Sequence, residues 1–346
     1  MEEKQNKKEK FSYSKLSTFA TCGWQYKLKY VDKNYVTFSS IAADFGTLVH
    51  YVEEIIAKDI IANNNEPYFM IDDQKYIDLF INADINEKEE TILGIKKLKE
   101  KYPNEFYVAD NSGMDYNEKA NDYLNYGIYR LRDYLAANRH LKIIAVEQPF
   151  ELDYSNYLFY GYIDRIFKNT LDDSLIVEDI KTWWTIDKRD LTTPLQFVFY
   201  SLACQELYKT DKITCMYDLP LTKNRYAAGT KGFMKRGIKK IDTLLESIEN
   251  KDFVPSPQAL CMWCPYSTTN REHIDKDEAL CPYRSNWTQI KKDFSVNYEW
   301  AGAENHAKIQ EDFLNKKNKV LAPIIVETND WKIFENKRIF LGKRTN

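Results

Sequence analysis

The sequence predicts a mixed α/β fold: a mixed sheet built in the order β-meander, helix, strand, behind a helical N-terminal region. Over residues 11–140, apolar residues recur at three- and four-residue intervals, which is typical of helices. From Leu141 onward the chain changes to three β-branched and aromatic runs separated by short turn compositions. An apolar helical pattern and a further strand pattern follow, and this order indicates a mixed sheet with a covering helix.

Composition limits the classes of protein that the chain can belong to. Its 346 residues suit one large domain or two coupled ones, and 44% apolar residues can bury a sizeable core. A net charge of −3, from 49 basic and 52 acidic residues, means that any nucleic acid must be held locally. We find no bilayer-spanning run and no signal-peptide core, so we expect a cytoplasmic protein, in the host cytoplasm if phage-encoded, without a membrane partner.

The N-terminal part is expected to be helical after a disordered tail over residues 1–10. A first helix should follow the candidate caps Ser12 and Ser14, and a longer one should cover 45–62. A helix capped by Asn86 should carry apolar residues as far as Pro103. A last apolar stripe completes a helical region over 11–140, and it comprises Leu124, Ile128, Leu131 and Leu135.

The core of the fold is expected over residues 141–250. Its three-stranded meander consists of IIAVEQPFEL, YLFYGYIDRIF and SLIVEDIKT, with turns at SN and NTLDDS. The helix should cover Leu195–Leu207 after Pro194, and the next strand should cover Lys212–Leu219. A C-terminal extension over 286–346 should end in a small hairpin at WKIFENKRIFL.

Two aspartates and a lysine interrupt the apolar pattern of the meander. Asp164 and Asp179 lie equally far from the turn near Leu171 and Asp172, so they should face each other with Cβ atoms about 4.5 to 5.5 Å apart. Facing carboxylates repel, and a hard cation between them would relieve the repulsion. Lys181 shares the face of Asp179 by strand alternation. The arrangement suits metal-assisted phosphodiester hydrolysis, and a surface hairpin with an Asp–Lys ion pair is the alternative.

Three further side chains are candidates for the same site. Gln196 and Tyr200 are spaced i, i+4 on the next helix and therefore share one face. His50 lies in GTLVH on an apolar helix, where a histidine buried in the core is the alternative to a ligand. Arg165 follows Asp164 and points to the opposite face of the strand, so it is left out of this set.

The motifs GYID, VEDIK and QFVFY, with GTLVH upstream, resemble the PD-(D/E)XK nuclease motifs of the RecB-like and AddB-like exonuclease family. The resemblance implies a restriction-endonuclease-like core. It also implies that His50, Asp164, Asp179 and the backbone carbonyl of Ile180 bind the metal and that Lys181 is the catalytic lysine. Gln196 and Tyr200 correspond to the family's QxxxY pair. Glu147 stands where members often carry an acidic residue, although it could equally be a solvated strand charge.

This resemblance implies a DNA exonuclease that hydrolyses phosphodiester bonds from ends with Mg²⁺ or Mn²⁺. Recombination, repair or phage DNA processing would be its setting, with a helicase or a recombination protein as a candidate partner. Two alternatives stay open at this point. One is a non-catalytic DNA-end-binding subunit of a helicase–nuclease-type complex, and the other is an endonuclease.

The cysteines suggest a second metal centre over residues 251–285. Cys261 and Cys264 form a CxxC motif, and Cys281 follows. Cys22, in FATCGWQYKLKY, resembles the N-terminal cysteine of the iron–sulfur members of the family, in which four thiolates hold a 4Fe-4S cluster. The gap before Cys281 is longer than the family's usual spacing, so a Cys3His zinc site completed by His273 is the alternative. We expect Cys204 and Cys215 to be core residues.

A basic loop is expected over residues 221–240, with seven basic residues and no acidic one. Charges for phosphates and rings for bases are the ingredients of a single-strand channel, although a solvated loop would have the same composition. The candidate DNA contacts are Lys223, Arg225, Lys231, Lys235 and Arg236.

Overall fold

The structure is a computed structural model that describes residues 8–36, 40–68, 72–87, 90–108, 113–183, 185–186, 191–256, 259–267 and 280–281. The chain divides into two compact units. Unit 1 comprises Met1–Tyr13 with Ser39–Ile241, and unit 2 comprises Ser14–Phe38 with Asp242–Asn346.

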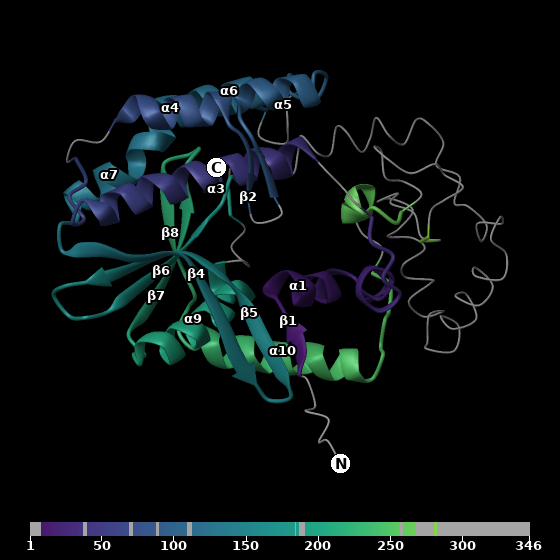
Figure 1. The fold of residues 1–346 in the computed structure, drawn as a ribbon. Coiled ribbons are helices and arrows are strands. Elements are labelled where there is room, and N and C mark those ends of the chain that lie inside the picture. Colours follow the sequence, from purple (N-terminus) through teal and green to yellow (C-terminus); the bar gives the residue numbers. More distant parts are fainter. Residues whose placement is uncertain are drawn as a thin grey trace, which may run out of the picture. The chain divides into compact units, whose positions relative to one another are not determined.

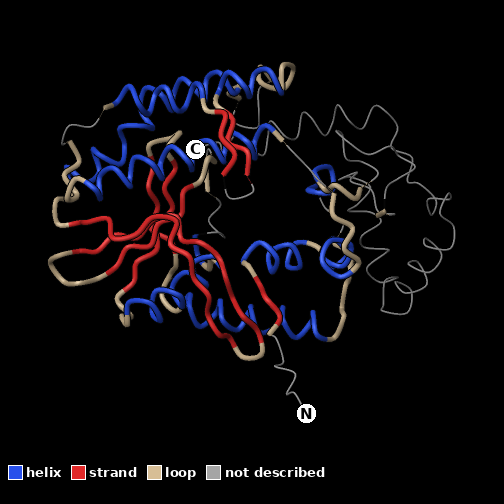
Figure 2. Tube along the Cα trace, viewed as in Figure 1, coloured by secondary structure: helices blue, strands red, loops and turns tan. Residues whose placement is uncertain are grey.

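Unit 1 is built on a six-stranded mixed sheet (Figures 1 and 2). Strands β4 (Leu141–Tyr154), β5 (Tyr157–Asn169) and β6 (Leu175–Ile180) form the antiparallel meander. Strand β7 (Ile213–Leu219) lies parallel to β6, and the antiparallel strand β8 (Asn224–Ala228) follows it. Helix α9 (Leu195–Tyr208) connects β6 to β7, because parallel neighbours need a crossover. The predicted fold class is therefore confirmed.

The helices of unit 1 include α3 (Ile41–Ala62), α4 (Asp73–Asn82), α5 (Ile95–Lys101), α6 (Tyr116–Asp122) and α7 (Ile128–Ala137). A π-helix, η2 (Tyr123–Gly127), joins α6 to α7. The Ser40 hydroxyl caps α3 by accepting from the Ala43 amide at 3.2 Å. Buried residues of α3 recur at three and four positions, and they pack in one apolar cluster with Phe167 of β5. Figure 1 shows α3 to α7 on one side of the strands and α9 on the other.

Three local expectations were wrong. The end of the supposed tail forms strand β1 (Glu9–Phe11), which pairs in parallel with Tyr157–Phe159 of β5. The helix expected from Asn86 is instead a hairpin of β2 (Asp84–Glu87) and β3 (Glu90–Leu93), followed by the short helix α5. Ile85 pairs directly with Ile92 across this hairpin, which gives the apolar residues a sheet partner.

The expected basic loop is the third error, because most of its residues lie in regular elements. Strand β8 occupies Asn224–Ala228, and helix α10 (Phe233–Glu249) begins before the last basic residues. The remaining residues form the turns between these elements. No helix in the described part of the chain is both long and apolar enough to cross a membrane.

Unit 2 brings together two ends of the described sequence. Its N-terminal segment contains most of α1 (Tyr13–Thr21), the short helix α2 (Gly23–Tyr26) and a π-helix, η1 (Lys27–Val31). Its C-terminal segment contains the 3₁₀ helix η3 (Ala259–Trp263). A Cβ atom built on Gly23 would lie 2.9 Å from the Val254 backbone, so the two segments meet at a glycine. Residue His273 and the extension 286–346, including the expected hairpin, lie outside the described residues.

Candidate active site

Strands β5 and β6 place two carboxylates side by side. Arg165 of β5 pairs with Glu178 of β6, so the neighbouring residues Asp164 and Asp179 follow in the same direction along the two strands. The Ile180 amide donates a hydrogen bond to Asp164 Oδ2 at 2.7 Å, which connects the strands at this point. Asp164 is 9% exposed and Asp179 is 1% exposed, so both are withdrawn from solvent. The antiparallel hairpin that the sequence predicts is therefore present, with the pair Arg165–Glu178 next to the two aspartates.

Helix α3 and strand β4 each add a group to Asp164. His50 Nδ1 lies 3.7 Å from Asp164 Oδ2. One ligand atom each from His50, Glu147 and Asp164 lies within 4.8 Å of the other two, the only such group of three in the described ranges. Glu147 has a φ of 47°, a conformation that costs a non-glycine residue on the order of 1–3 kcal/mol. The backbone of β4 is therefore strained at the residue that faces the histidine and the aspartate.

Lys181 connects the carboxylates to helix α9. Its Nζ lies 2.7 Å from Asp179 Oδ2 and donates to Gln196 Oε1 at 3.3 Å. Gln196 Nε2 in turn donates to the Tyr200 hydroxyl at 2.8 Å. The i, i+4 spacing on α9 allows this second contact, and Gln196 can therefore orient the lysine side chain.

Burial sets the protonation of the site. Burial raises the pKa of Asp179 to about 6, and the negative charge of Asp164 acts in the same direction. The positive charge of Lys181 partly opposes this increase. Burial also raises the pKa of Asp164. Burial and the Lys181 charge lower the pKa of His50 to about 4, so its imidazole is neutral at pH 7. A neutral imidazole and carboxylate oxygens are donors that a divalent cation accepts, and the donor set fits such an ion.

A comparison with protein families decides what kind of chain carries this site. The sequence-family model of the PD-(D/E)XK nuclease superfamily matches residues 10–269. This range includes all of the side chains described above. The chain belongs to the PD-(D/E)XK nuclease superfamily. Membership supports a nuclease with DNA as its substrate. A crystal structure of a candidate exonuclease from Eubacterium rectale is similar at 11% identity and a TM-score of 0.38, covering 77% of this chain and 90% of that chain. No curated protein matches the sequence.

The residues expected to contact DNA in this nuclease have different surroundings. Lys231 and Lys235 are exposed. Lys223 lies over the Tyr126 ring, with Nζ 3.0 Å from the centroid. Arg236 donates to the Thr192 carbonyl at 3.2 Å and to the Lys231 carbonyl at 2.8 Å. Arg225 was expected to contact DNA, and this expectation is corrected. Its buried guanidinium lies 2.8 Å from Asp218 and 3.2 Å from Glu178, so it is not available to a phosphate in solvent.

Four cysteines of the nuclease line one pocket of unit 2. They are Cys22, Cys261, Cys264 and Cys281, and the pocket has about 390 Å³ of empty space that is partly open to solvent. Trp24, Leu28 and Tyr266 supply apolar walls. The Ser256 amide donates to Cys22 Sγ at 3.4 Å. Among the described residues, no three of these sulfur atoms all lie within 4.8 Å of one another. Cys204 and Cys215 are not among the residues that line this pocket, and both are buried within unit 1, in α9 and β7.

Sequence reasoning missed two exposed rings beside the site. Tyr162 lies two residues before Asp164 and is 54% exposed, and Trp183 lies two residues after Lys181 and is 46% exposed. The Lys181 ammonium is 5.5 Å from the centroid of the Trp183 ring. For Tyr162 the signal was present in the sequence, because residues two positions apart on a strand project to the same side.

Proposed function

We propose that this chain is a divalent-metal-dependent DNA exonuclease of the RecB-like and AddB-like branch, which uses Mg²⁺ or Mn²⁺. The observation that carries the proposal is the buried pair Asp164 and Asp179 with Lys181 between Asp179 and Gln196, in a chain of the nuclease superfamily. Two buried carboxylates beside one lysine leave negative charge that a cation would offset. We place this activity in the cytoplasm, in recombination, repair or phage DNA processing, with a helicase or recombination protein as a candidate partner.

Each residue has a role in this proposal. His50, Glu147 and Asp164 hold the cation, together with Asp179 and the Ile180 carbonyl. A bound divalent cation supplies water of lowered pKa and neutralises charge on the phosphate. Lys181 offers an ammonium to the negative charge that develops on the phosphate oxygens. Gln196 orients Lys181, and Tyr200 holds the amide of Gln196 in place.

The two exposed rings support a preference for unpaired strands. Aromatic side chains bind single strands by stacking on bases, whereas the bases of a duplex are covered by their neighbours. Tyr162 and Trp183 flank Asp164 and Lys181 in the sequence, so an unpaired base could stack beside the reacting phosphate. Lys231 and Lys235 are exposed cations that could contact the backbone of the same strand.

We also propose that the cysteine pocket holds a 4Fe-4S cluster. Four thiolates are the usual ligand set of such a cluster, and the pocket is lined by four. The amide that donates to Cys22 Sγ is the kind of hydrogen bond that tunes cluster sulfurs. A zinc ion held by three of the cysteines and His273 is the alternative.

A cleavage assay distinguishes the proposal from its alternatives. Labelled single-stranded, double-stranded and circular DNA would be incubated with Mg²⁺, Mn²⁺ or EDTA. We expect linear single strands to be shortened from an end in the presence of metal, with circles left intact. Cut circles would indicate an endonuclease. Binding to DNA ends without cleavage in either metal would indicate the non-catalytic subunit.

A further inference from the structure

Six ionisable side chains are buried in unit 1 next to the candidate site. We call them the buried ion cluster: Glu53, Arg130, Arg165, Glu178, Asp218 and Arg225. Three are acidic and three are basic, and no side chain of the cluster is more than 10% exposed. Each comes from a different element, namely α3, α7, β5, β6, β7 and β8. The cluster therefore joins two helices to four strands.

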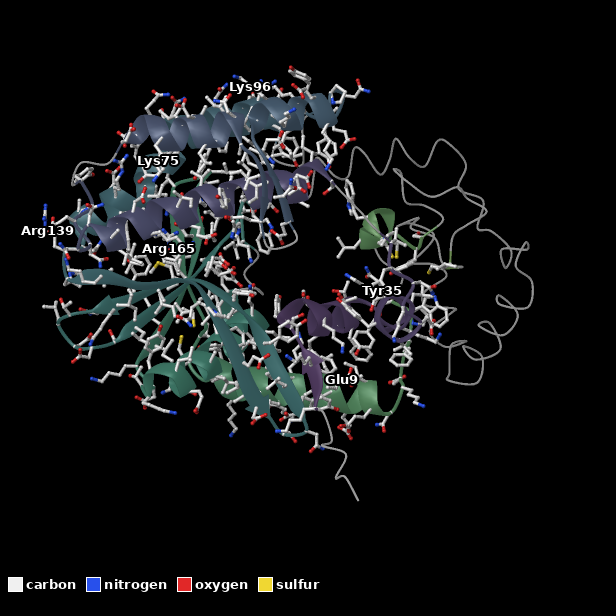
Figure 3. The ribbon with its side chains drawn as sticks, in the orientation of Figure 1. Glu9, Tyr35, Lys75, Lys96, Arg139 and Arg165 are labelled. Carbon is white, nitrogen blue, oxygen red and sulfur yellow. The ribbon has the colours of Figure 1, made fainter. Side chains whose placement is uncertain are left out.

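Arg165 is at the centre of these contacts. Figure 3 shows it between α3 and the strands of the sheet. Its Nε lies 2.9 Å from Glu178 Oε2, and its Nη2 lies 3.4 Å from Glu53 Oε2 and 3.8 Å from Asp218 Oδ2. One guanidinium thus reaches carboxylates of α3, β6 and β7. The planar fork of arginine can make these contacts in several directions, which the ammonium of lysine cannot reproduce.

The second and third arginines complete the cluster. Arg225 bridges Glu178 at 3.2 Å and Asp218 at 2.8 Å, and Arg130 Nη2 lies 2.8 Å from Asp218 Oδ1. The Tyr123 hydroxyl donates to Glu53 Oε1 at 3.2 Å. Every carboxylate of the cluster therefore contacts at least one arginine.

Stability is a poor explanation for this cluster. Moving charges out of water is costly, and buried ion pairs can often be replaced by apolar residues without loss of stability. Burial raises the pKa of Glu53 to about 7, so the arginines do not fully offset that cost at this carboxylate. The cluster must supply something that apolar side chains cannot, and ion pairs supply direction and register.

Residues of the buried ion cluster are sequence neighbours of the residues of the candidate site. Arg165 follows Asp164, and Glu178 precedes Asp179. The Lys181 amide donates to the Asp218 carbonyl at 2.8 Å, and Glu53 follows His50 by three residues on α3. A slip of one residue between β5 and β6 would exchange the faces of the sheet and turn Arg165 toward the metal-binding groups.

We propose that the buried ion cluster is a positioning device for the metal site. The Arg165–Glu178 pair fixes the register of β5 against β6, and this holds Asp164, Asp179 and Lys181 together. The Arg165–Glu53 contact ties α3 to the sheet and so places His50. The inference rests on the proposed function, because it assigns metal binding to the positioned groups.

The test replaces the central pair by apolar residues in the full chain. The double variant Arg165→Met, Glu178→Met leaves two acidic and two basic members, so charge stays balanced. We expect a melting temperature within a few degrees of wild type. Mn²⁺ binding, measured by calorimetry, should weaken ten- to hundredfold, with a similar fall in kcat, as when groups that orient metal ligands are removed. Hydrogen exchange at the Ile180 amide should accelerate.

Two further variants separate positioning from general stability. Lys168→Met, Asp173→Asn removes an exposed ion pair at the turn that follows β5 and should leave all of these quantities unchanged. Arg165→Lys keeps the charge, and we expect it to fold and to lose part of the Mn²⁺ affinity. Wild-type Mn²⁺ affinity and Ile180 protection in Arg165→Lys and in the double variant would overturn the proposal. If the wild-type chain failed to cleave DNA, the proposed function would fail, while Mn²⁺ binding and Ile180 exchange would still test positioning.

Discussion

Lys181 Nζ and Asp179 Oδ2 lie 2.7 Å apart at the end of β6. Substitutions that keep the size of each side chain can test their roles in catalysis without disturbing the fold. Asp179→Asn keeps the shape of the side chain and removes its charge, and Lys181→Met keeps most of the aliphatic stem. Each should lower the cleavage rate on the order of 10²-fold or more, because Asp179→Asn removes a charge that holds the cation and Lys181→Met removes a charge that acts on the reacting phosphate. Initial rates on labelled single strands measure this. Wild-type turnover by both variants would refute the assignment.

His50 gives a pH dependence whose direction can be stated. Its pKa of about 4 in the fold lies below the ordinary value of 6.5, so between these values the unfolded chain binds more protons. The stability that His50 contributes is therefore complete above pH 6.5 and is lost as the pH falls toward 4. In metal-free protein, the melting temperature of wild type relative to His50→Asn should decrease over this window. The side chain is 32% exposed, so solvent reduces the effect.

A metal titration completes the test of His50. His50→Ala should need more Mn²⁺ for half-maximal cleavage. A large loss of melting temperature in His50→Ala, with unchanged metal dependence, would instead make His50 an ordinary core residue.

The hairpin that carries the two predicted aspartates could be predicted from local geometry, and its antiparallel register is present in the structure. Asp164 and Asp179 were predicted to face each other from their equal distance to a turn, which is a property of any hairpin. Glu147 was harder to assign from the sequence. Its carboxylate lies near His50 and Asp164, and its backbone has a left-handed conformation that a strand pattern does not indicate. Arg225 was misjudged, because a basic residue is buried only when distant carboxylates are present, and those came from β6 and β7.

At the scale of elements, α9 and α10 pack through a glycine. A Cβ atom at Gly237 would lie 2.3 Å from Val198 Cγ2, and valine is stiff at χ1. Gly237→Ala gains about 1 kcal/mol of helix propensity but incurs about 1–3 kcal/mol of overpacking, so we expect a net loss of unfolding free energy. In a Val198→Ala background the same change should instead stabilise the protein. Urea unfolding of the four variants measures the sign, and equal effects in both backgrounds would contradict this packing.

The elements that the sequence predicted correctly are those with long, regular patterns. The meander, α9 and β7 have runs of apolar residues that fit one period only. Strand β1 was missed because three residues acquire their structure from pairing with β5, about 150 residues away in sequence. The β2–β3 hairpin was missed because its apolar residues also fit a helical spacing, and its pairing decided between the two.

At the scale of the molecule, the cysteine pocket unites the two sequence segments of unit 2. Protein purified without oxygen should be brown and contain about four irons per chain if all four thiolates hold one cluster. Replacing Cys22, Cys261, Cys264 or Cys281 singly with serine should bleach the colour and favour aggregation, because the two segments lose a shared tie. Cys204→Ser and Cys215→Ser are the matched controls and should keep both colour and iron. Iron and sulfide analysis with visible absorption measures the outcome.

The zinc alternative has its own signature. A colourless protein with one zinc per chain, lost in His273→Ala but kept in Cys281→Ser, would exclude the cluster and leave the nuclease proposal intact.

The divided sequence of unit 2 also sets an order of events during synthesis. Cys261 follows Cys22 by 239 residues (261 − 22), and unit 1 is encoded almost entirely between them. At 5 to 20 residues per second, a ribosome needs roughly 12 to 48 s to travel that distance. During this time the Cys22 thiol lacks the partners that line its pocket, while most of the sheet can already form. Any group held by all four thiols can therefore be acquired only after the nuclease core has been made.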